Sequence, residues 1–368
     1  MKRRDFVKAL GAGTLLAGGL SACGSENQPA NKSSADRKTF EWRMVTTWPP
    51  NFPGLGTGAN RLAKRIEAMS GGRIRIRVYG GGELVPPLET FDTVSRGAVE
   101  MGHGAAYYWK GKAPAAQFFA AVPFGMTGQE MNGWLYHGGG IELWRELYQP
   151  FNLVPFPVGN TGVQMGGWFN VPINSVADLN GLKMRIPGLG GEVLKRAGGT
   201  PVTLAGSEIF TALQTGAIDA TEWVGPYNDL AFGLFKAAKY YYYPGWHEPG
   251  STLECIINRH AWQSLPEDLQ AIVAEACRAA NLDMLAEFTA RNQQALRTLV
   301  DKHHVDLRPF PADVLSKLRK LSAQVLEDTA GDDAAFRKVF DSYRAFQKQV
   351  TAWDDISERA YMNARAAD

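Results

Sequence analysis

The regular alternation of strand-like and helix-like segments near the start of the chain constrains the fold most strongly. Residues 40–44 and 73–78 alternate apolar and polar side chains with a period of two, which is typical of strands. Between them Leu62, Ile66 and Met69 repeat at helical spacing, and a Ser-Gly-Gly sequence ends that pattern. A strand, a helix and a strand in this order predict an α/β fold with a mainly parallel sheet.

The same pattern continues along the chain. A helix is expected from Pro86 to about Gly97, and the proline-rich stretch 155–157 is expected to mark a change of domain. Beyond it we expect strands and helices at 164–170 (strand), 175–181 (turn and short helix), 183–186 (strand), 191–197 (helix), 208–214 (helix capped by Ser207) and 218–224 (strand). An unbroken helical pattern from Pro266 to about Leu299 predicts a helix that bridges two lobes or reaches a second subunit.

The first 38 residues predict export and not a folded domain. Arg3 and Arg4 precede the apolar run 9–20, which is well short of the ~20 residues that a membrane-spanning helix needs. Small residues before Cys23 form a lipobox, so we expect cleavage after residue 22 and lipidation of Cys23. The paired arginines resemble a twin-arginine signal, with Lys2 where Ser or Thr is usual. The polar stretch 24–38 is expected to be a flexible tether, leaving the lipid as the only membrane attachment.

Charge and cysteine content exclude several classes of function. The whole chain has a formal charge of +2, but residues 1–22 carry a net +3, so the mature chain is close to −1 and offers no basic face for nucleic acid. No cysteine or histidine has zinc-site spacing, and no HExxH motif is present. Cys255 and Cys277 could pair in an oxidising compartment, although two buried thiols are the commoner outcome.

Several segments resemble the extracytoplasmic solute receptors of tripartite ATP-independent periplasmic (TRAP) transporters. The resemblance rests first on residues 175–185 (SVADLNGLKMR) and 208–223 (EIFTALQTGAIDATEW). Residues 48–53 (WPPNFP), 106–112 (AYYWKGK) and 158–164 (VGNTGVQ) narrow it to the branch that resembles 2-oxo acid and lactate receptors. The segments occur in this order across nearly the whole chain after the tether.

The resemblance implies a two-lobed fold of the type II periplasmic binding protein kind. We therefore expect a signal peptide (1–22), a lipidated tether (23–38), a first lobe (39–157, completed by part of 250–368), a second lobe (158–249), and a crossover strand with long helices spanning both lobes (250–368). It also implies closure around a small monocarboxylate, such as pyruvate or lactate, and delivery to a membrane permease driven by an ion gradient. The long helix resembles one through which such receptors form homodimers.

Arg185 is the first candidate for ligand binding. It is expected at the carboxyl end of a parallel strand, where α/β folds present ligands, and a guanidinium there can hold a carboxylate with two parallel hydrogen bonds. The residues alone leave open a surface arginine paired with Asp178 or Glu192. The resemblance implies that Arg185 binds the substrate carboxylate.

Glu222 points to a cofactor. In the same cleft its charge would repel an anionic ligand unless a cation lay between the two carboxylates. Gln164, Glu222 and the backbone carbonyl of Trp223 can supply oxygen ligands, and the resemblance implies Na⁺ or Ca²⁺ bridging protein and substrate. The alternative is that Gln164 is a strand-edge side chain and Glu222 a solvated acid.

Aromatic residues supply further candidates. Tyr107 and Tyr108 could wall the pocket, and the resemblance favours one of their hydroxyls as a ligand contact without choosing between them. Tyr residues 240–243, with Trp246 and Glu248, are expected where the chain crosses between lobes, as a hinge, a pocket wall or core aromatics. The remaining substrate-binding candidates are Phe52 and Asn160.

Three other functions stay open at this point. The chain could be a receptor for another organic acid or for an ATP-driven importer, which shares the two-lobe arrangement. It could also be a periplasmic enzyme, because Arg185, Glu222 and a metal could polarise a carbonyl. Against catalysis, no serine or cysteine has a recognisable base, and no histidine lies inside the motif segments, although His247 borders Glu248.

Overall fold

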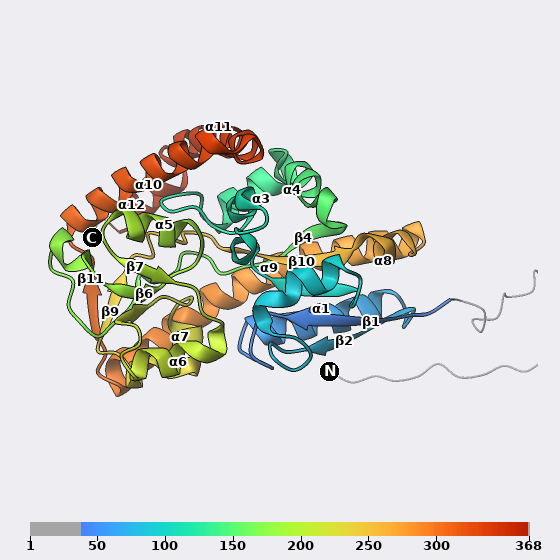
Figure 1. Ribbon diagram of the computed structural model, residues 1–368, viewed down its shortest axis with the longest axis horizontal. Coiled ribbons are helices and arrows are strands. Elements are labelled where there is room, and N and C mark those ends of the chain that lie inside the picture. Colours follow the sequence, from blue (N-terminus) through green and yellow to red (C-terminus); the bar gives the residue numbers. More distant parts are fainter. Residues whose placement is uncertain (1–37, 367–368) are drawn as a thin grey trace, which may run out of the picture. The chain divides into compact units, whose positions relative to one another are not determined.

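The chain from residue 38 to 366, as described by the computed structural model, contains two β-sheets flanked by helices (Figure 1). The predicted signal, Cys23 and most of the tether lie outside the described residues. From Thr39 onward, the described residues form one compact unit. No helix among the described residues is both long and apolar enough to cross a membrane. The mixed α/β class expected from the sequence is confirmed.

The first sheet has the strand order β2-β1-β3-β10-β4. Its strands are β1 (Phe40–Thr46), β2 (Ile74–Tyr79), β3 (Met101–Gly104), β4 (Leu153–Asn160) and β10 (Thr252–Asn258). β1 is parallel to β2 and β3, whereas β10 is antiparallel to both β3 and β4. The apolar faces of α1 (Leu55–Met69) and α9 (Glu267–Arg297) share one buried cluster with this sheet, because Leu62, Ile66 and Val273 pack with strand residues there.

The second sheet has the strand order β11-β9-β5-β8-β6-β7. Its strands are β5 (Gly167–Phe169), β6 (Lys183–Arg185), β7 (Thr200–Val202), β8 (Ala220–Thr221), β9 (Tyr240–Tyr243) and β11 (Asp306–Pro309). Only β5 runs antiparallel to its neighbours β8 and β9; the other paired strands are parallel. Helices α5 (Gly188–Arg196), α6 (Gly206–Gln214) and α7 (Pro226–Phe232) accompany this sheet.

The reversed strand in each sheet marks where the chain crosses from one sheet to the other. The connection 161–166 joins β4 to β5, and the connection 244–251 joins β9 to β10. The two connections are hydrogen-bonded to each other, because Thr161 N donates to Ser251 O at 3.0 Å and Gln164 N donates to Glu248 O at 3.2 Å. The name hinge is used below for residues 161–166 and 244–251 together.

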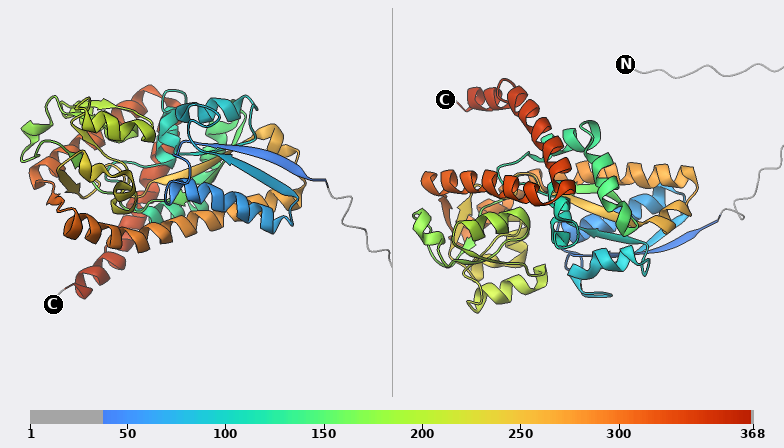
Figure 2. Two further views of the ribbon diagram at one scale, coloured as in Figure 1. Left: turned by 90° about the horizontal axis from the view of Figure 1, so that it is seen from below. Right: turned by 45° about the horizontal axis from the view of Figure 1, so that its top comes forward.

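The remaining helices lie around the two sheets (Figures 1 and 2). They are α2 (Thr90–Ser95), α3 (Gly128–His137), α4 (Gly140–Tyr148), α8 (Arg259–Gln263), α10 (Ala312–Asp332), α11 (Ala334–Asp354) and α12 (Glu358–Arg365). α9 contacts α1 and β4 of the first sheet and also α7 beside the second. α10 packs on α5, while α11 packs on α3 and α4. The sequence-based expectation of a long helix spanning both regions is confirmed.

Some expected boundaries were wrong. The proline-rich stretch 155–157 lies inside β4, and the chain leaves the first sheet only after Asn160. Proline is tolerated there because β4 is an edge strand, where a missing N–H leaves no partner unsatisfied. Ser207 does not cap α6; the helix begins at Gly206, and Ala205 N donates to the Glu208 carboxylate at 3.1 Å. The strand β11 was not expected.

Candidate ligand and cation site

Arg185 and Glu222 meet because their strands are neighbours in the second sheet. β6 ends at Arg185, which lies opposite Thr221 of β8, and Glu222 follows directly. Both side chains are buried, at 1% and 0% exposure. The Arg185 guanidinium forms an ion pair with Oε1 of Glu222, and its Nε donates to the carbonyl of Leu204 at 3.3 Å. The alternatives of a surface arginine and a solvated acid were therefore wrong.

Arg185 also reaches the first sheet's side of the molecule. Its Nη2 donates to the hydroxyl of Tyr108 at 3.2 Å, and its guanidinium carbon lies 5.3 Å from the centre of the Trp223 ring. The acids that could have held it elsewhere are engaged: Glu192 pairs with Lys110 at 2.6 Å, and Asp178 accepts from backbone N–H groups of the turn before it. The guanidinium thus links Glu222 of the second sheet's region to Tyr108 of the first.

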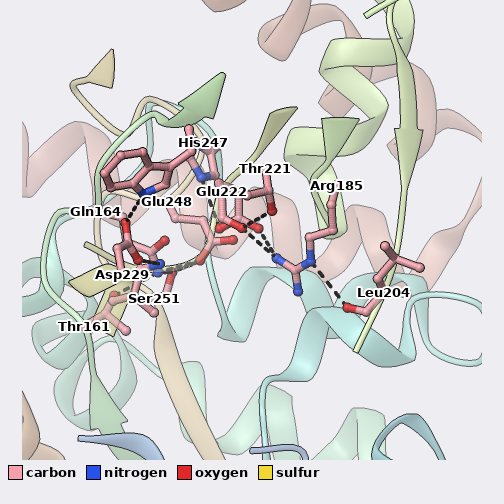
Figure 3. Close-up of polar contacts among 12 residues, drawn as sticks. Thr161, Gln164, Arg185, Leu204, Thr221, Glu222, Asp229, His247, Glu248 and Ser251 are labelled. Atoms are coloured by element: carbon pink, nitrogen blue, oxygen red, sulfur yellow. Dashed lines mark hydrogen bonds and ion pairs between the residues drawn. The ribbon is translucent and has the colours of Figure 1, made fainter. Parts of the chain in front are cut away.

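The second oxygen of Glu222 faces a different set of groups. Oε2 has no hydrogen-bond partner and lies 3.5 Å from Nε2 of His247. One ligand atom from each of Glu222, His247 and Glu248 lies within 4.8 Å of the others. Figure 3 shows the Glu222 carboxylate between the Arg185 guanidinium on one side and His247 and Glu248 on the other. One oxygen of Glu222 therefore pairs with the Arg185 guanidinium, and the other faces a group of possible metal ligands.

The hinge supplies the other polar residues. Gln164 lies in the connection before β5, not on a strand edge as the alternative had it. Its Nε2 is placed to donate to Thr161 Oγ1 (3.1 Å), Glu248 Oε2 (2.9 Å) and Ser251 Oγ (3.2 Å), while its Oε1 is buried without a partner. An amide oxygen left unsatisfied inside a protein is costly and is a natural cation ligand.

Burial sets the protonation of these groups. Desolvation raises the pKa of the Glu222 carboxyl to about 7, with Arg185 acting in the opposite direction. Desolvation, reinforced by the charge of Glu222, raises the pKa of Glu248 to about 7. Burial lowers the pKa of His247 to about 4, so its ring is neutral at pH 7. Two carboxyl groups this close and this dry favour a bound cation when both are ionised.

A narrow space of about 10 Å³, room for roughly one water molecule, adjoins Gln164. Its lining comes from both sheets' regions and the hinge: Trp48, Leu55, Tyr107, Tyr108, Thr161, Gln164, Trp223, Val224 and Leu253. Pockets for drug-sized ligands are roughly 300–1,000 Å³. The space in the structure is far smaller than such a pocket, so an acid can enter only if the surrounding side chains or the two regions move apart.

The other sequence candidates are placed differently. Tyr107 lines the cavity and packs edge-on against Tyr108, whose hydroxyl is the one that reaches Arg185. Phe52 lies behind the pocket wall, with its ring 6.1 Å from that of Trp223. Asn160 lies beside the hinge and not in the pocket, because its amide donates to Gly250 O and Thr252 Oγ1 at 3.1 Å each.

The aromatic run 240–243 forms β9, and Tyr241 and Tyr242 are core aromatics, one of the alternatives left open. Trp246 and Glu248 lie in the connection 244–251, where the chain crosses between the sheets as expected. Trp246 packs against Phe124. The proximity of His247 to Glu222 was not predicted, since the two residues lie 25 positions apart and no spacing motif joins them. Cys255 and Cys277 are buried free thiols.

Comparisons with known proteins agree with this architecture. The model of a family described as bacterial extracellular solute-binding protein, family 7 (DctP), matches residues 44–332. A monocarboxylate 2-oxoacid-binding periplasmic protein of Nostoc sp. is 44% identical over 363 residues, which are 99% of this chain and 98% of the relative.

Two solved structures are similar over most of this chain. A TRAP periplasmic solute-binding protein of Pseudoalteromonas atlantica with bound sodium and pyruvate is 44% identical, with a TM-score of 0.86, covering 89% of this chain and 99% of that one. A TRAP transporter solute-binding protein of Bordetella bronchiseptica, a dimer with calcium and picolinate in one of its sites, is 38% identical, with a TM-score of 0.88, covering 90% and 98%.

Proposed function

The chain belongs to the DctP family of bacterial extracellular solute-binding proteins, family 7, and from this premise we propose that it captures a small monocarboxylate together with a metal cation. The acid is a 2-oxo acid such as pyruvate or a 2-hydroxy acid such as lactate, and the cation is Na⁺ or Ca²⁺. The observation that carries this proposal is the buried Arg185–Glu222 pair, which leaves Glu222 Oε2 and Gln164 Oε1 unsatisfied beside a small cavity.

The donors fit a cation bridged to an acid. Arg185 binds the carboxylate of the acid through its guanidinium, by charge-assisted hydrogen bonds worth roughly 1.5–3 kcal/mol each. Glu222, Gln164 and the backbone carbonyl of Trp223 hold the cation, which the acid completes with a carboxylate oxygen and its 2-oxo or 2-hydroxy oxygen. Tyr108 orients the guanidinium from the other side.

Charge explains why the acid and the cation bind together. Fully ionised Glu222, Glu248 and substrate carry three negative charges against the single positive charge of Arg185. A Ca²⁺ ion balances this excess. With Na⁺, a proton on one carboxyl completes the balance, which a pKa of about 7 for Glu248 permits.

Closure of the two lobes couples binding to transport. Trp48 and Tyr108 of the first sheet's region and Trp223 of the second line the cavity. An acid that contacts both regions therefore favours the closed over the open state. The closed form is what a TRAP permease recognises, and the receptor supplies selectivity. Of the alternatives, the family assignment favours a receptor over a periplasmic enzyme and a TRAP permease over an ATP-driven importer.

Export and anchoring follow from the N-terminal sequence. We propose cleavage after residue 22, lipidation of Cys23 and, through Arg3 and Arg4, export by the twin-arginine route. The tether 23–38 then keeps the receptor near a permease in the same membrane. Globomycin treatment, which blocks lipoprotein signal cleavage, should shift the mass of the wild-type chain but not of Cys23→Ser.

A homodimer through the C-terminal helices is also proposed. Trp353 at the end of α11, Ile356 in the turn after it, and Tyr361 and Met362 on α12 are 53–74% exposed, and a second copy would cover them. In α9, by contrast, the apolar side chains mostly pack within the chain. Sedimentation should give a dimer for the wild type and a monomer for the Trp353→Glu, Ile356→Glu double variant; an unchanged dimer would remove these helices from the interface.

Thermal unfolding of protein stripped of ligand tests the function directly. Pyruvate, longer 2-oxo acids, lactate and dicarboxylates are each added with Ca²⁺, Na⁺ or a chelator. A ligand at about 100 times its dissociation constant adds ~2.7 kcal/mol, which raises Tm by several degrees. A rise limited to monocarboxylates and dependent on the cation supports the proposal, and no rise with any acid contradicts the substrate class.

A further inference from the structure

A cavity of about 650 Å³ lies between the segment that follows β3 and the helices α5 and α10. It shares no lining residue with the space beside Gln164 where the acid is proposed to bind. Pockets that bind small molecules are roughly 300–1,000 Å³, so this cavity is large enough for one. Its walls come from the first sheet's region on one side and from the second sheet's region on the other.

Gln117 carries an unsatisfied polar atom at this cavity. The residue is 4% exposed and lines the cavity. Its Nε2 donates to Pro114 O at 3.0 Å, which fixes the orientation of the amide, and its Oε1 has no hydrogen-bond partner. A buried amide oxygen without a donor is costly, so a ligand that supplies an N–H or O–H to it gains binding energy.

Helix α5 supplies an acid and a cation to the same cavity. Leu189, Glu192 and Lys195 follow one another at intervals of three residues and all line it. Lys110 pairs with Oε1 of Glu192 at 2.6 Å, so the second carboxylate oxygen can accept a further hydrogen bond. The exposed Lys195 has no ion-pair partner within the described part of the chain. The cavity therefore offers two acceptors and one unpaired cation.

The spacing of these groups sets the length of a ligand. A Cβ at Gly188, the first residue of α5, would lie 3.7 Å from Gln117 Oε1. Lys195 lies two turns further along the helix, which is about 10 Å at a rise of about 1.5 Å per residue. An extended peptide of two or three residues spans roughly 7–10 Å. Such a peptide carries a donor at one end and an anion at the other.

We infer that this cavity binds a short peptide of two or three residues with both ends free. Its N-terminal ammonium donates to Gln117 Oε1 and to Glu192, and its carboxylate pairs with Lys195. Small apolar side chains of the peptide pack on Leu189 and Val325, which are 2% and 4% exposed. This site goes beyond the proposed function, because it uses none of the groups that are proposed to bind the acid or the cation.

A peptide in this cavity contacts both regions of the molecule. Gln117 belongs to the first sheet's region, whereas α5 follows β6 of the second, so the peptide favours the closed over the open state. This coupling, unlike the binding itself, rests on the proposed function. Peptide should then tighten the binding of pyruvate with Ca²⁺ by at least about twofold, and pyruvate should tighten peptide binding by the same factor.

Calorimetric titration of the full chain with trialanine, in the absence of any acid, tests the site. We expect wild type to bind trialanine, and Gln117→Met to bind it at least about tenfold more weakly, because a hydrogen bond to the charged ammonium is lost. Lys195→Gln should weaken binding by about 2- to 5-fold, since that cation is exposed. The matched control is Lys317→Gln, which removes an exposed lysine of α10 that does not line the cavity. N-acetyl-trialanine and trialanine amide, which each lack one charged end, should bind more weakly than trialanine.

The outcomes separate this inference from the proposed function. No binding of trialanine to wild type, or equal affinity in wild type and Lys195→Gln, overturns the inference, and the exposed Lys195 gives this answer even if Gln117→Met does not fold. Stabilisation by pyruvate and Ca²⁺ without trialanine binding overturns the inference and leaves the proposed function standing. Trialanine bound through Lys195, with no response to any acid, supports the peptide site and contradicts the proposed function. Equal pyruvate affinity with and without bound trialanine overturns the coupling.

Discussion

Arg185 is the residue on which the substrate class depends. In the structure its guanidinium donates to Leu204 O, Glu222 and Tyr108, so a bound carboxylate has to take the place of at least one of these partners. We expect Arg185→Lys to weaken pyruvate binding at least tenfold, or ~1.4 kcal/mol, because an ammonium replaces the fork with a point charge. Calorimetry with saturating Ca²⁺ measures the affinity. Arg196→Lys, on exposed α5 surface, is the matched control, and near-unchanged affinity in Arg185→Lys would remove this arginine from the site.

The proposed binding of a cation depends on Glu222. Glu222→Gln keeps a carbonyl oxygen for Arg185 but removes the charge that attracts the cation. We expect the ratio of pyruvate affinities with and without Ca²⁺ to fall by roughly tenfold relative to wild type. Glu254→Gln is the control, because Glu254 is equally buried but accepts from Trp109 and Tyr148 within the first sheet's region. A variant with the wild-type ratio would show that no cation bridges Glu222 and the acid.

At the scale of elements, one ion pair joins the two regions at the mouth of the site. Lys110, just after the turn that carries Tyr108, pairs with Glu192 of α5 at 2.6 Å. Both side chains are about 35–42% exposed, so the pair is worth only ~0.2–1 kcal/mol. We expect Lys110→Gln to speed ligand release by about 1.5- to 5-fold, an effect that fades at high salt.

The neighbouring Lys112 makes this test specific. It pairs with Asp92 of α2 at 3.0 Å, within the first sheet's region. Lys112→Gln therefore removes the same charge without removing a contact between the two regions. Stopped-flow measurement of pyruvate release compares the two variants. Equal release rates would mean that the Lys110–Glu192 pair does not hold the closed state.

The sequence predicted elements best where one face of a segment is buried. β2 alternates because one of its faces packs on the core, and α1 has a continuous apolar stripe, so both were found. β8 spans only Ala220–Thr221, which is too short for any periodicity. The prolines of the edge strand β4 led to a wrong prediction of a domain boundary at residues 155–157. Of the site, Arg185 and Glu222 could be proposed because motifs carry them, whereas His247 comes from the hinge, whose folding brings distant segments together without a local pattern.

At the scale of the whole molecule, buried acids link stability to pH. Desolvation raises the pKa of Glu222, Glu248, Asp229 and Glu254 to about 7 each. Each group binds its proton more tightly in the folded than in the unfolded chain, where its pKa is near 4. Its stabilising contribution is therefore present at low pH and is lost as the pH rises through 7.

Two buried histidines act in the opposite direction, over a lower range. Burial lowers the pKa of His103 to about 3 and of His247 to about 4, so folding is favoured as their unfolded forms deprotonate near pH 6.5. Above pH 6.5 the four acids dominate. We expect the Tm of the protein, freed of cation and acid, to fall by roughly 5 °C between pH 6.5 and 8.0.

Cation and substrate should weaken this trend, because they bind the ionised forms of Glu222 and Glu248. With saturating Ca²⁺ and pyruvate, the fall in Tm over the same range should be roughly halved, since Asp229 and Glu254 keep their contribution, as scanning calorimetry in matched buffers would show. Glu254→Gln should lose part of the cation-free slope but keep the full response to Ca²⁺ and pyruvate, since it lies outside the site. A Tm that rises with pH without cation would mean that these carboxyls are ionised in the folded protein, and the charge balance argued for the site would then fail.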